Sequence, residues 1–363
     1  MTSILFECHH LYYLPNFLPI IEEFQQRDGY SLSASIPHII NDLERRHLCK
    51  AVETVGIEFI DGDNEATRQT ELKSRKFDVV IVGIPGMLEK VVSDNTVAVM
   101  VYHGIGLKES YYRDTSPRIN IRTVESQERY DELTRMGQTN LVLAGYTKID
   151  TLASTDSQKN SQFLETLNLS PERPTLLYAP TFYPSSVEQV LPKLPGLAQE
   201  VNVIIKLHGF SWSQRRYRHH SEQAKQILGE GIYLVTREDY NIVPYYSVSD
   251  MLLSDISSTL FEYLALDRPI IQTTFYKPRL KHRILKSRLQ KRLDLARTEK
   301  INFTQRLDHP EELEAIVSET VKNPDSMSGA RQKAAERYLY RTDGKASARL
   351  VDAIEEYVGE GER

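Results

Sequence analysis

The sequence predicts an α/β fold built from two similar domains, each with a parallel β-sheet flanked by helices. Short apolar runs rich in Val and Ile alternate with helical patterns along most of the chain, and such runs are typical of parallel strands buried on both faces. The length of 363 residues exceeds what one ordinary core contains. The alternation also pauses once near the middle, so each half carries its own set of predicted strands.

The first half contains six runs of strand length. They are Ile4–Phe6, Ser31–Ile36, Ile57–Ile60, Val79–Val82, Val97–Tyr102 and Leu141–Leu143. Helical patterns lie between them, for example at Phe17–Arg27 and Ile39–Val52. The stretch Thr151–Asn160 is polar and poor in core residues, which predicts a linker. We therefore place the first domain at residues 1–155.

The second half repeats the pattern with five runs. They are Thr175–Ala179, Val201–Leu207, Ile232–Val235, Met251–Leu253 and Pro269–Gln272. After Asp308 the chain is predicted to be mostly helical. The last helix, after Gly344, places Ala346, Leu350, Ile354 and Val358 on one face at i+4 spacing. The second domain is expected at residues 156–340, followed by a terminal helix at 341–363.

Composition limits the classes of function. The charged fraction of 26% and hydrophobic fraction of 40% are those of a soluble globular protein, and a net charge of −5 offers no global attraction to nucleic acid. Two cysteines, Cys8 and Cys49, make no disulfide framework and indicate a reducing cytoplasm. No signal pattern and no apolar run of about 20 residues is present, so membrane association is expected to be peripheral at most.

One early cluster suggests metal ligands at first sight. Cys8, His9 and His10 are consecutive, but no second pair of ligands accompanies them at a spacing that a zinc site would use. We therefore expect no metal there.

A hydroxyl-rich turn follows the run Met251–Leu253 and precedes a predicted helix that Pro269 closes. The hydroxyls of Ser257 and Ser258, with the free N–H groups of a helix N-terminus, suit a diphosphate. Glu262 follows one turn later, within reach of a ribose. Both features have a structural alternative: the serines as N-caps, and Glu262 as the end of a capping box that starts at Thr259.

Two histidines follow predicted strands, one in each half. His103 comes after Val97–Tyr102, beside Gly104 and Gly106, whose freedom of backbone conformation would shape the loop. A histidine at the carboxyl end of a parallel strand lies where ligands bind in such sheets, and it can serve as a general base near neutral pH. A structural histidine held in a turn is the alternative.

His208 repeats this design in the second half, because it follows an apolar strand and precedes Gly209. An imidazole there would neutralise charge on a leaving phosphate. Lys206 alternates with it along the predicted strand, so both side chains are expected on one side. Thr181 ends the segment Tyr178–Thr181, a rigid loop that could present backbone groups to a base. Taken alone, the segment is more simply an ordinary exit from a strand into a loop.

Two basic clusters stand apart from these strand ends. The first contains Lys277, Arg279, Lys281, Arg283, Lys286, Arg288, Lys291 and Arg292, and the second contains Arg215, Arg216, Arg218, His219 and His220. A solvated helix face is the ordinary interpretation of the first, and contact with an anionic acceptor or lipid surface is the functional one. No aromatic residue follows Tyr276 in this run, which argues against single-stranded nucleic acid.

Six short motifs follow one another along the chain: His103–Lys108, Gly145–Asp150, Tyr178–Thr181, Lys206–Gly209, Asp255–Glu262 and Asp343–Ser347. In this order they resemble the CDP-glycerol glycerophosphotransferase family of teichoic-acid polymerases and primases. The family carries there His-Gly-Thr-Pro-Leu-Lys, Gly-Tyr-Pro-(Arg/Lys)-x-Asp, Tyr-Ala-Pro-Thr, Lys-x-His-Pro, Asp-Tyr-Ser-Ser with a later acidic residue, and Asp-Gly-Lys-Ala-Ser. Each motif is weak alone, but six in the right order are fairly specific. The resemblance runs from about residue 97 to the C-terminus.

The resemblance implies a GT-B fold, in which two Rossmann-like domains face each other across a cleft and the C-terminal helix crosses back to the N-terminal domain. It implies transfer of glycerol phosphate, or a related polyol phosphate, from a CDP-activated donor to an acceptor hydroxyl, with release of CMP, during synthesis of a cell-wall or surface polymer. Neither a metal nor another cofactor is implied. The acceptor would be a polyol phosphate or a lipid-linked glycan, handled in the cytoplasm at the inner face of the membrane.

By the same resemblance, His103 would activate the acceptor hydroxyl in the N-terminal acceptor domain. In the C-terminal donor domain, His208, Ser257 and Ser258 would hold the donor phosphates and Glu262 the ribose.

The sequence departs from the family pattern around these residues. Glycines, Gly106 and Gly209, replace the prolines of the two histidine motifs, Phe182–Pro184 replaces the residues that commonly follow Tyr-Ala-Pro-Thr, and Ile256 replaces the Tyr of Asp-Tyr-Ser-Ser. The identity of the polyol is therefore open. Two alternatives remain: a GT-B glycosyltransferase or UDP-sugar 2-epimerase, and a non-catalytic nucleotide-binding protein.

Overall fold

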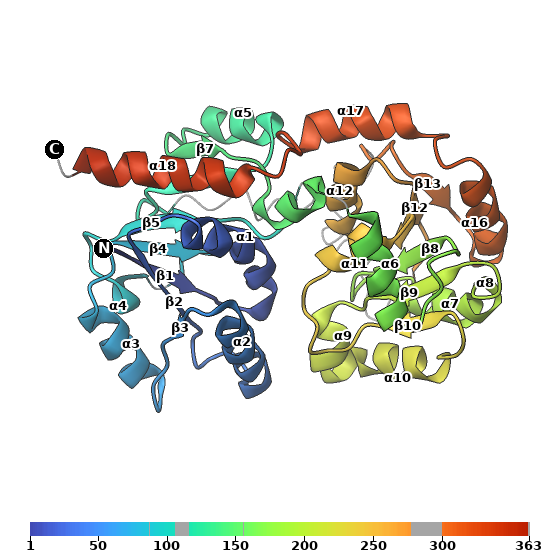
Figure 1. The fold of residues 1–363 in the computed structure, drawn as a ribbon, viewed down its shortest axis with the longest axis horizontal. Helices are drawn as coiled ribbons and strands as arrows, with labels where there is room; N and C mark the ends of the chain where they lie inside the picture. The colour runs from blue at the N-terminus through green and yellow to red at the C-terminus, as the bar shows by residue number, and fades with distance from the viewer. Residues whose placement is uncertain (87, 106–115, 155, 277–299, 362–363) are drawn as a thin grey trace, which may run out of the picture. The chain divides into compact units, whose positions relative to one another are not determined.

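The computed structural model of the protein describes residues 1–86, 88–105, 116–154, 156–276 and 300–361. These residues form two compact units (Figure 1). The first unit contains Met1–Gly104 with the described parts of Ser110–Ala153 and Arg337–Arg363, and the second contains chiefly the described part of Ser154–Glu336. The C-terminal helix therefore belongs to the first unit, to which the resemblance assigned it.

The first unit is built on a seven-stranded sheet with the order β3-β2-β1-β4-β5-β6-β7. All neighbouring strands are parallel. The strands are β1 (Thr2–Glu7), β2 (Tyr30–Ser35), β3 (Glu58–Phe59), β4 (Val79–Val82), β5 (Val97–Met100), β6 (Ile121–Val124) and β7 (Leu141–Leu143). The order reverses between β1 and β4. In doubly wound sheets, ligands bind outside the carboxyl ends of the strands at this reversal.

The helical segments of the first unit connect these strands. They are η1 (Leu11–Tyr13), α1 (Leu14–Gln25), α2 (Asp42–Val55), α3 (Glu65–Ser74), α4 (Leu88–Val91), α5 (Gln127–Arg135), η3 (Thr147–Ala153) and α18 (Ala346–Gly361). Short polar side chains begin several of them, as helix starts require. Asn41, Asn64 and Ser126 accept a backbone N–H at the first turn of α2, α3 and α5.

The second unit repeats the plan with a six-stranded parallel sheet, ordered β10-β9-β8-β11-β12-β13. The strands are β8 (Thr175–Tyr178), β9 (Asn202–Ile205), β10 (Ile232–Leu234), β11 (Met251–Ser254), β12 (Ile270–Thr273) and β13 (Gln305–Leu307). The helical segments are α6 (Ser157–Thr166), α7 (Val187–Val190), η4 (Leu191–Lys193), α8 (Leu194–Leu197), α9 (Gly209–Ser213), η5 (Arg215–Tyr217), α10 (Arg218–Gln226), α11 (Val243–Val248), α12 (Thr259–Glu262), η6 (Tyr263–Leu266), η7 (Pro310–Glu312), α16 (Leu313–Lys322) and α17 (Ser328–Tyr338). Here the order reverses between β8 and β11.

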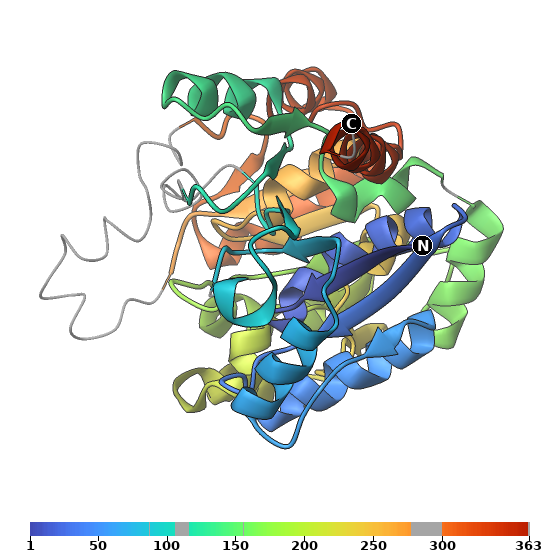
Figure 2. The ribbon, with the colours of Figure 1, turned by 90° about the vertical axis from the view of Figure 1, so that its left-hand side faces the viewer.

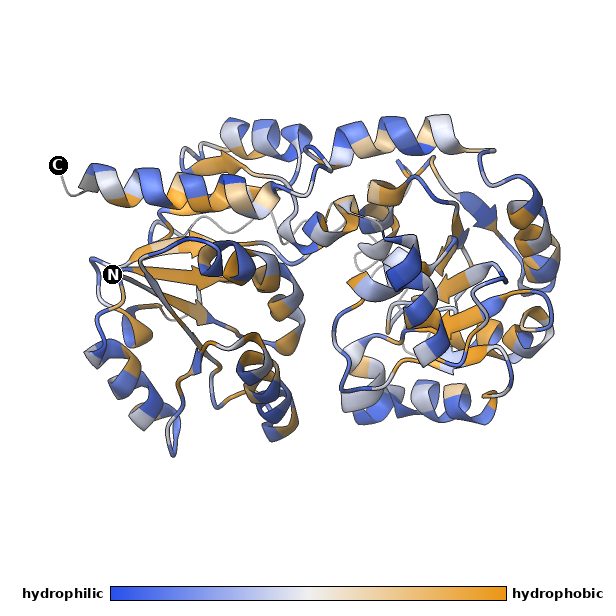
Figure 3. Cartoon of the chain, viewed as in Figure 1, coloured by the Kyte–Doolittle hydropathy of each residue, from blue (hydrophilic) through white to orange (hydrophobic). Residues whose placement is uncertain are grey.

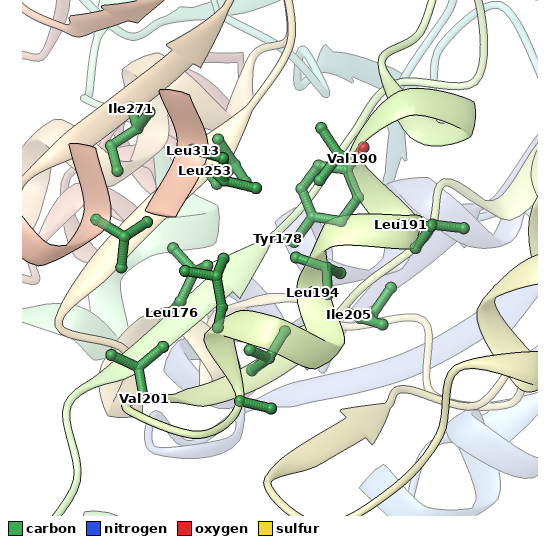
Figure 4. Packing of buried hydrophobic residues seen from close by; sticks show 14 of the residues in the cluster. Leu176, Tyr178, Val190, Leu191, Leu194, Val201, Ile205, Leu253, Ile271 and Leu313 are labelled. Atoms are coloured by element: carbon green, nitrogen blue, oxygen red, sulfur yellow. The ribbon is translucent and has the colours of Figure 1, made fainter. Parts of the chain in front are cut away.

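Each sheet is apolar and each set of helices is polar on its outer side (Figure 3). The core of the second unit packs strand residues such as Leu176, Ile205 and Leu253 against Leu194 and Leu313 from the covering helices (Figure 4). Burying one such side chain contributes about 1.5–3 kcal/mol. Among the described residues, no helix combines the length and the hydropathy needed to cross a bilayer.

Two strands were not predicted from the sequence, β6 and β13. β6 carries Arg122 in the middle of its apolar run, yet Arg122 is fully buried. Its guanidinium donates to the Ser116 carbonyl at 2.9 Å and to the Tyr102 hydroxyl at 3.4 Å, so the cost of burying the charge is offset by partners that the sequence pattern does not reveal. The predicted linker at Thr151–Asn160 was also too long, because η3 runs to Ala153 and α6 begins at Ser157.

The C-terminal helix α18 is anchored to the first unit by two of the resembling motifs. Both oxygens of Asp150 accept backbone N–H groups at the start of α18, from Ala346 at 3.0 Å and from Ser347 at 2.7 Å. Gly344 allows this close approach, since its φ is +70° and a Cβ there would lie 2.9 Å from the Asp150 carbonyl oxygen. The apolar face of α18, including Leu350 and Ile354, is buried, and the helix packs against α1 (Figure 2).

Replacing Asp150 with alanine should destabilise the protein by about 1–2 kcal/mol, because it removes the capping acceptor of α18. Urea unfolding of the full chain measures this change. Asp352→Ala is the matched control: its carboxylate also lies on α18 but is 65% exposed and pairs with Arg27 at the surface, so we expect a loss below about 1 kcal/mol. Equal losses in the two variants would contradict the capping role of Asp150.

Candidate active site

The reversal of strand order in the second unit brings two of the resembling motifs together. Tyr178 ends β8 and Ser254 ends β11, and these strands are neighbours. The Ser254 hydroxyl donates to the Ala179 carbonyl at 2.6 Å and lies 2.9 Å from the Thr259 hydroxyl. The turn after β11 is thus tied both to the end of β8 and to the start of α12, in the position where such sheets bind nucleotides.

Asp255 is the most heavily bonded residue of this turn. It is 4% exposed, and its carboxylate accepts hydrogen bonds from the hydroxyls of Ser185, Ser186 and Thr273 and from the backbone N–H of Ser186. Burial raises the pKa of Asp255, and the hydrogen bonds from Ser186 and Thr273 oppose that rise. Its bonds run to the loop that carries Ser185 and Ser186 and to the end of β12 at Thr273, so Asp255 ties together the segments around this turn.

In the sequence, Asp255 was identified only as the first residue of the motif Asp255–Glu262, and no role in the site was predicted for it. The serines at 185 and 186 carried no signal at all, because the Tyr183–Pro184 stretch ahead of them departs from the family pattern. Only the folded chain brings these loops together.

Replacing Asp255 with alanine should lower the melting temperature by roughly 5–10 °C. An orphaned buried donor costs about 1–3 kcal/mol, and each kcal/mol corresponds to about 2–4 °C in a unit of this size. Differential scanning calorimetry measures the shift. Asp308→Ala is the control, since its carboxylate also accepts a threonine hydroxyl but is 53% exposed; a drop as large as that of Asp255→Ala would contradict the bracing role.

The hydroxyl-rich turn itself is only partly covered. Ser257 and Ser258 are half-buried, and within the described residues their backbone N–H groups donate to no protein acceptor. The predicted helix is short, because α12 has four residues and is followed by the 3-10 turn η6. The turn therefore offers a ligand two amides and two hydroxyls rather than the dipole of a long helix. The Ser258 side chain forms no capping bond. The N-cap alternative for Ser258 is therefore wrong, whereas Ser257 does accept a bond from the Thr259 N–H at 3.4 Å.

Glu262 is 1% exposed and is held by an unanticipated partner. The Tyr246 hydroxyl, from α11, donates to its carboxylate at 2.9 Å. A capping box would need the Thr259 hydroxyl to accept the Glu262 N–H. That N–H instead bonds the Ser258 carbonyl at 3.0 Å, and the Thr259 hydroxyl lies against Ser254. The capping-box alternative is therefore wrong, and Glu262 is a buried acid oriented by a tyrosine.

His208 lies at the N-terminus of α9. Its Nδ1 accepts the backbone N–H of Phe210 at 3.1 Å. Because a ring nitrogen that accepts a hydrogen bond carries no proton, the neutral imidazole has its proton on Nε2 and is a donor there. A donor is what a phosphate oxygen requires.

The neighbours of His208 differ from expectation in two ways. β9 ends at Ile205, before Lys206, so strand alternation does not place Lys206 and His208 on one side. The backbone N–H of Lys206 bonds the Tyr178 carbonyl at 2.9 Å. Gly209 begins α9, and a Cβ there would meet nothing within 4 Å, so the backbone at Gly209 does not require glycine.

Three of the departures from the family pattern, Phe182, Tyr183 and Ile256, belong to one mainly aromatic cluster beside His208. The ring centroid of Phe182 lies 4.7 Å from that of His208 and 5.0 Å from that of Phe210. Ile256 packs against the same cluster, whose buried members are Tyr183 and Tyr217. Thr181, half-buried, begins the loop that carries these rings. The substituted positions thus form a single apolar wall beside the imidazole.

In the first unit, His103 lies between two tyrosines. Its ring centroid is 4.9 Å from that of Tyr12 and 4.6 Å from that of Tyr13, the latter in an edge-on arrangement. The Tyr13 ring covers Gly83, just after β4, where a Cβ would come within 2.0 Å of the ring. Both tyrosines follow β1, so residues from the carboxyl ends of β1, β4 and β5 meet at the reversal of this sheet. Gly104, next to His103, is buried.

The first 95 residues gave no motif, and Tyr12 and Tyr13 were missed for that reason. The available signal was their place shortly after the first predicted strand, where ligand-binding residues of such sheets gather.

The Cys8, His9 and His10 cluster forms no group of metal ligands among the described residues. Cys8 is fully buried. Burial, together with the nearby charge of Arg68, lowers the pKa of His9 to about 4. The His10 ring stacks on Tyr12 at 5.0 Å and its Nδ1 lies 3.4 Å from Glu44.

Some predicted residues lie outside the described part of the chain. They are Gly106 and the basic run Lys277, Arg279, Lys281, Arg283, Lys286, Arg288, Lys291 and Arg292.

Two Rossmann-like parallel sheets, each with residues gathered at its strand reversal, define an α/β protein of the GT-B fold class. The sequence profile of the CDP-Glycerol:Poly(glycerophosphate) glycerophosphotransferase family matches residues 89–356. The chain belongs to this family, and is accordingly a CDP-glycerol glycerophosphotransferase-type enzyme with a CDP-glycerol donor. No individual curated protein matches the chain in sequence.

Solved structures support the same fold. The wall teichoic acid polymerase TagF aligns over 99% of this chain and 90% of its own, with 16% identity and a TM-score of 0.69. The UDP-GlcNAc 2-epimerase of Neisseria meningitidis, bound to UDP-GlcNAc, aligns over 98% of this chain and 100% of its own, with 14% identity and a TM-score of 0.60. A putative UDP-N-acetylglucosamine 2-epimerase of Listeria monocytogenes has 13% identity over 99% and 97%, with a TM-score of 0.62.

Proposed function

We propose that this enzyme transfers glycerol phosphate from CDP-glycerol to a hydroxyl of a polyol-phosphate or lipid-linked glycan acceptor, as in wall teichoic acid synthesis. Membership of the glycerophosphotransferase family carries the proposal. The crevice between β8 and β11, with a hydroxyl-rich turn, a donor imidazole and a buried acid, supports it from the chemistry. The similarity to TagF, also known in a form soaked with CDPG, is consistent with it.

The second unit, proposed at residues 156–340, binds the donor. The amides and hydroxyls of Ser257 and Ser258 bind the diphosphate, with Lys206 adding positive charge. Glu262, oriented by Tyr246, accepts the ribose hydroxyls. Thr181 lies on the loop after β8 that borders the nucleotide. Asp255 shapes this site through its loop contacts without touching the donor.

The first unit, proposed at residues 1–155 with the helix at 341–363, binds the acceptor. His103 takes the proton of the attacking hydroxyl, and the oxygen forms a bond to the phosphorus that bears glycerol. The bond from that phosphorus to the bridging oxygen breaks, and CMP leaves with the electron pair. A positioned base contributes roughly 10²–10⁴-fold. The Nε2–H of His208 stabilises the charge that develops on the departing phosphate.

Peripheral attachment to the inner face of the membrane is part of the proposal. It rests on the basic run between Lys277 and Arg292, where each basic residue contributes about 1 kcal/mol of attraction to an anionic surface. Binding to anionic vesicles that is lost at high salt would support it, and equal binding by a variant neutralised at Lys281, Arg283 and Lys286 would refute it.

The decisive test of the reaction follows the nucleotide product. The purified enzyme, with a glycerol-phosphate-primed acceptor, is incubated separately with CDP-glycerol, CDP-ribitol, UDP-GlcNAc and UDP-glucose. We expect CMP from CDP-glycerol, together with lengthening of the acceptor. Release of CMP from CDP-ribitol alone would mean that the transferred group is ribitol phosphate and not glycerol phosphate. Release of UDP, or formation of an epimerised sugar, without release of CMP would overturn the proposal.

A further inference from the structure

A second constellation of polar side chains lies in the second unit, in a pocket that shares Phe182, Tyr183 and Tyr217 with the aromatic cluster beside His208. Three groups that can bind a metal converge there: Glu188 from α7, and His219 and His220 from the first turn of α10. They line a pocket of about 450 Å³. The proposed transfer reaction uses none of the three, and sequence analysis noted the two histidines only as part of a basic cluster.

The separations of the three ligand atoms match those around a zinc ion. Glu188 Oε1 lies 3.1 Å from His219 Nε2 and 3.5 Å from His220 Nε2, and all three atoms lie within 4.8 Å of one another. Zinc binds histidine nitrogen and carboxylate oxygen at about 2.0–2.2 Å with tetrahedral angles, which sets neighbouring ligand atoms about 3.3 Å apart. The two distances from Glu188 lie on either side of this value.

A neighbouring hydroxyl orients the ring of His220. His220 is 2% exposed, and its Nδ1 lies 3.1 Å from the Ser211 hydroxyl. A donor bond from Nδ1–H to Ser211 leaves the lone pair on Nε2, the nitrogen that faces Glu188. Metal-bound histidines characteristically use their second nitrogen in this way.

The charge of the cluster also suits a cation. One carboxylate and two imidazoles leave a divalent ion with one positive charge. Arg216, which lines the same pocket, disfavours a bare cation and favours an anion or hydroxide as the remaining ligand.

We propose that Glu188, His219 and His220 bind one Zn²⁺ ion, with a fourth coordination position open to the pocket. Three protein ligands and an open position are the arrangement of catalytic rather than closed structural zinc sites. The ion would join α7 to α10, and through Ser185, which bonds Asp255, it would support the loop that borders the donor crevice. The proposal departs from the expectation from sequence that the chain holds no metal, and it stands independently of the transfer reaction.

The test measures metal directly, on tag-free protein stripped with a chelator and then dialysed. Zinc bound per chain is determined by atomic emission, and affinity by competition with a chromophoric chelator. We expect one zinc per chain in the wild type. Glu188→Gln and His219→Gln should each weaken binding more than about 100-fold, and Ser211→Ala, which removes only the orienting bond, by about 10–100-fold.

The controls separate a zinc site from a general loss of structure. His309→Gln removes an exposed histidine of the same unit and should bind zinc as the wild type does. His219 is 45% exposed, so His219→Gln is expected to fold, as circular dichroism will check. The proposal is overturned if the wild type retains no zinc, or if the Glu188 and His219 variants bind it equally well. In either case the three residues form an ion pair between Glu188 and a protonated histidine.

Discussion

Replacing His103 with alanine should lower kcat for glycerol phosphate transfer by roughly 10²–10⁴-fold, the contribution of a positioned general base. The KM for CDP-glycerol should change little, because the donor is assigned to the second unit and His103 acts only as the transition state forms. Steady-state CMP release at saturating acceptor measures both constants. The surrounding rings of Tyr12 and Tyr13 should keep the fold intact around the truncated side chain.

Two control variants accompany this measurement. His309→Ala removes an exposed histidine outside both sites and should leave kcat unchanged. Tyr13→Phe keeps the ring that packs edge-on against His103 and should preserve most of the activity. If the His103→Ala variant retained the wild-type kcat, His103 would not be the general base.

Replacing His208 with asparagine should lower kcat by roughly 10²–10³-fold, the usual effect of removing one preorganised donor to a developing negative charge. Asparagine is chosen because its side-chain oxygen can accept the Phe210 N–H and so retain the cap of α9, whereas its short amide cannot reach as far as Nε2–H. Activity should therefore fall while the melting temperature stays within about 2 °C of the wild type.

His208→Ala provides the matched comparison. It removes both the cap and the donor, so the same loss of activity should appear together with about 1 kcal/mol of lost stability. If the asparagine variant kept full activity and only the alanine variant lost it, the histidine would be a helix cap and not a phosphate ligand. The two variants thus separate the structural from the chemical function of one residue.

The strands and the order of the motifs could be predicted from sequence because both depend on local pattern. The runs Val79–Val82 and Leu141–Leu143 coincide with β4 and β7. The central strand β4 is fully buried, as a continuous apolar run predicts, whereas the edge strand β7 is only half-buried. β6 escaped prediction because Arg122 interrupts its apolar pattern. Its charge is satisfied by the Ser116 carbonyl and the Tyr102 hydroxyl, which lie in other parts of the chain.

The residues of the candidate site also divide into those that the local sequence pattern predicts and those that it does not. His103, His208 and the turn at Ser257 were found because they directly follow apolar runs, and the carboxyl end of a parallel strand is where binding residues gather. Tyr246 and Ser186 were not found, because each becomes a site residue only through a contact with a residue far away in the sequence, Glu262 and Asp255 respectively.

The sequence by itself determined the two α/β halves, the family and the strand-end position of both histidines, because these follow from periodicity and short motifs. Only the tertiary structure decided that Asp150 caps the terminal helix, that Glu262 is held by Tyr246 instead of a capping box, and that Glu188 meets His219 and His220. The physical reason is that hydrogen bonds and ligand geometry depend on distances between side chains, and those distances are set by how strands and helices pack.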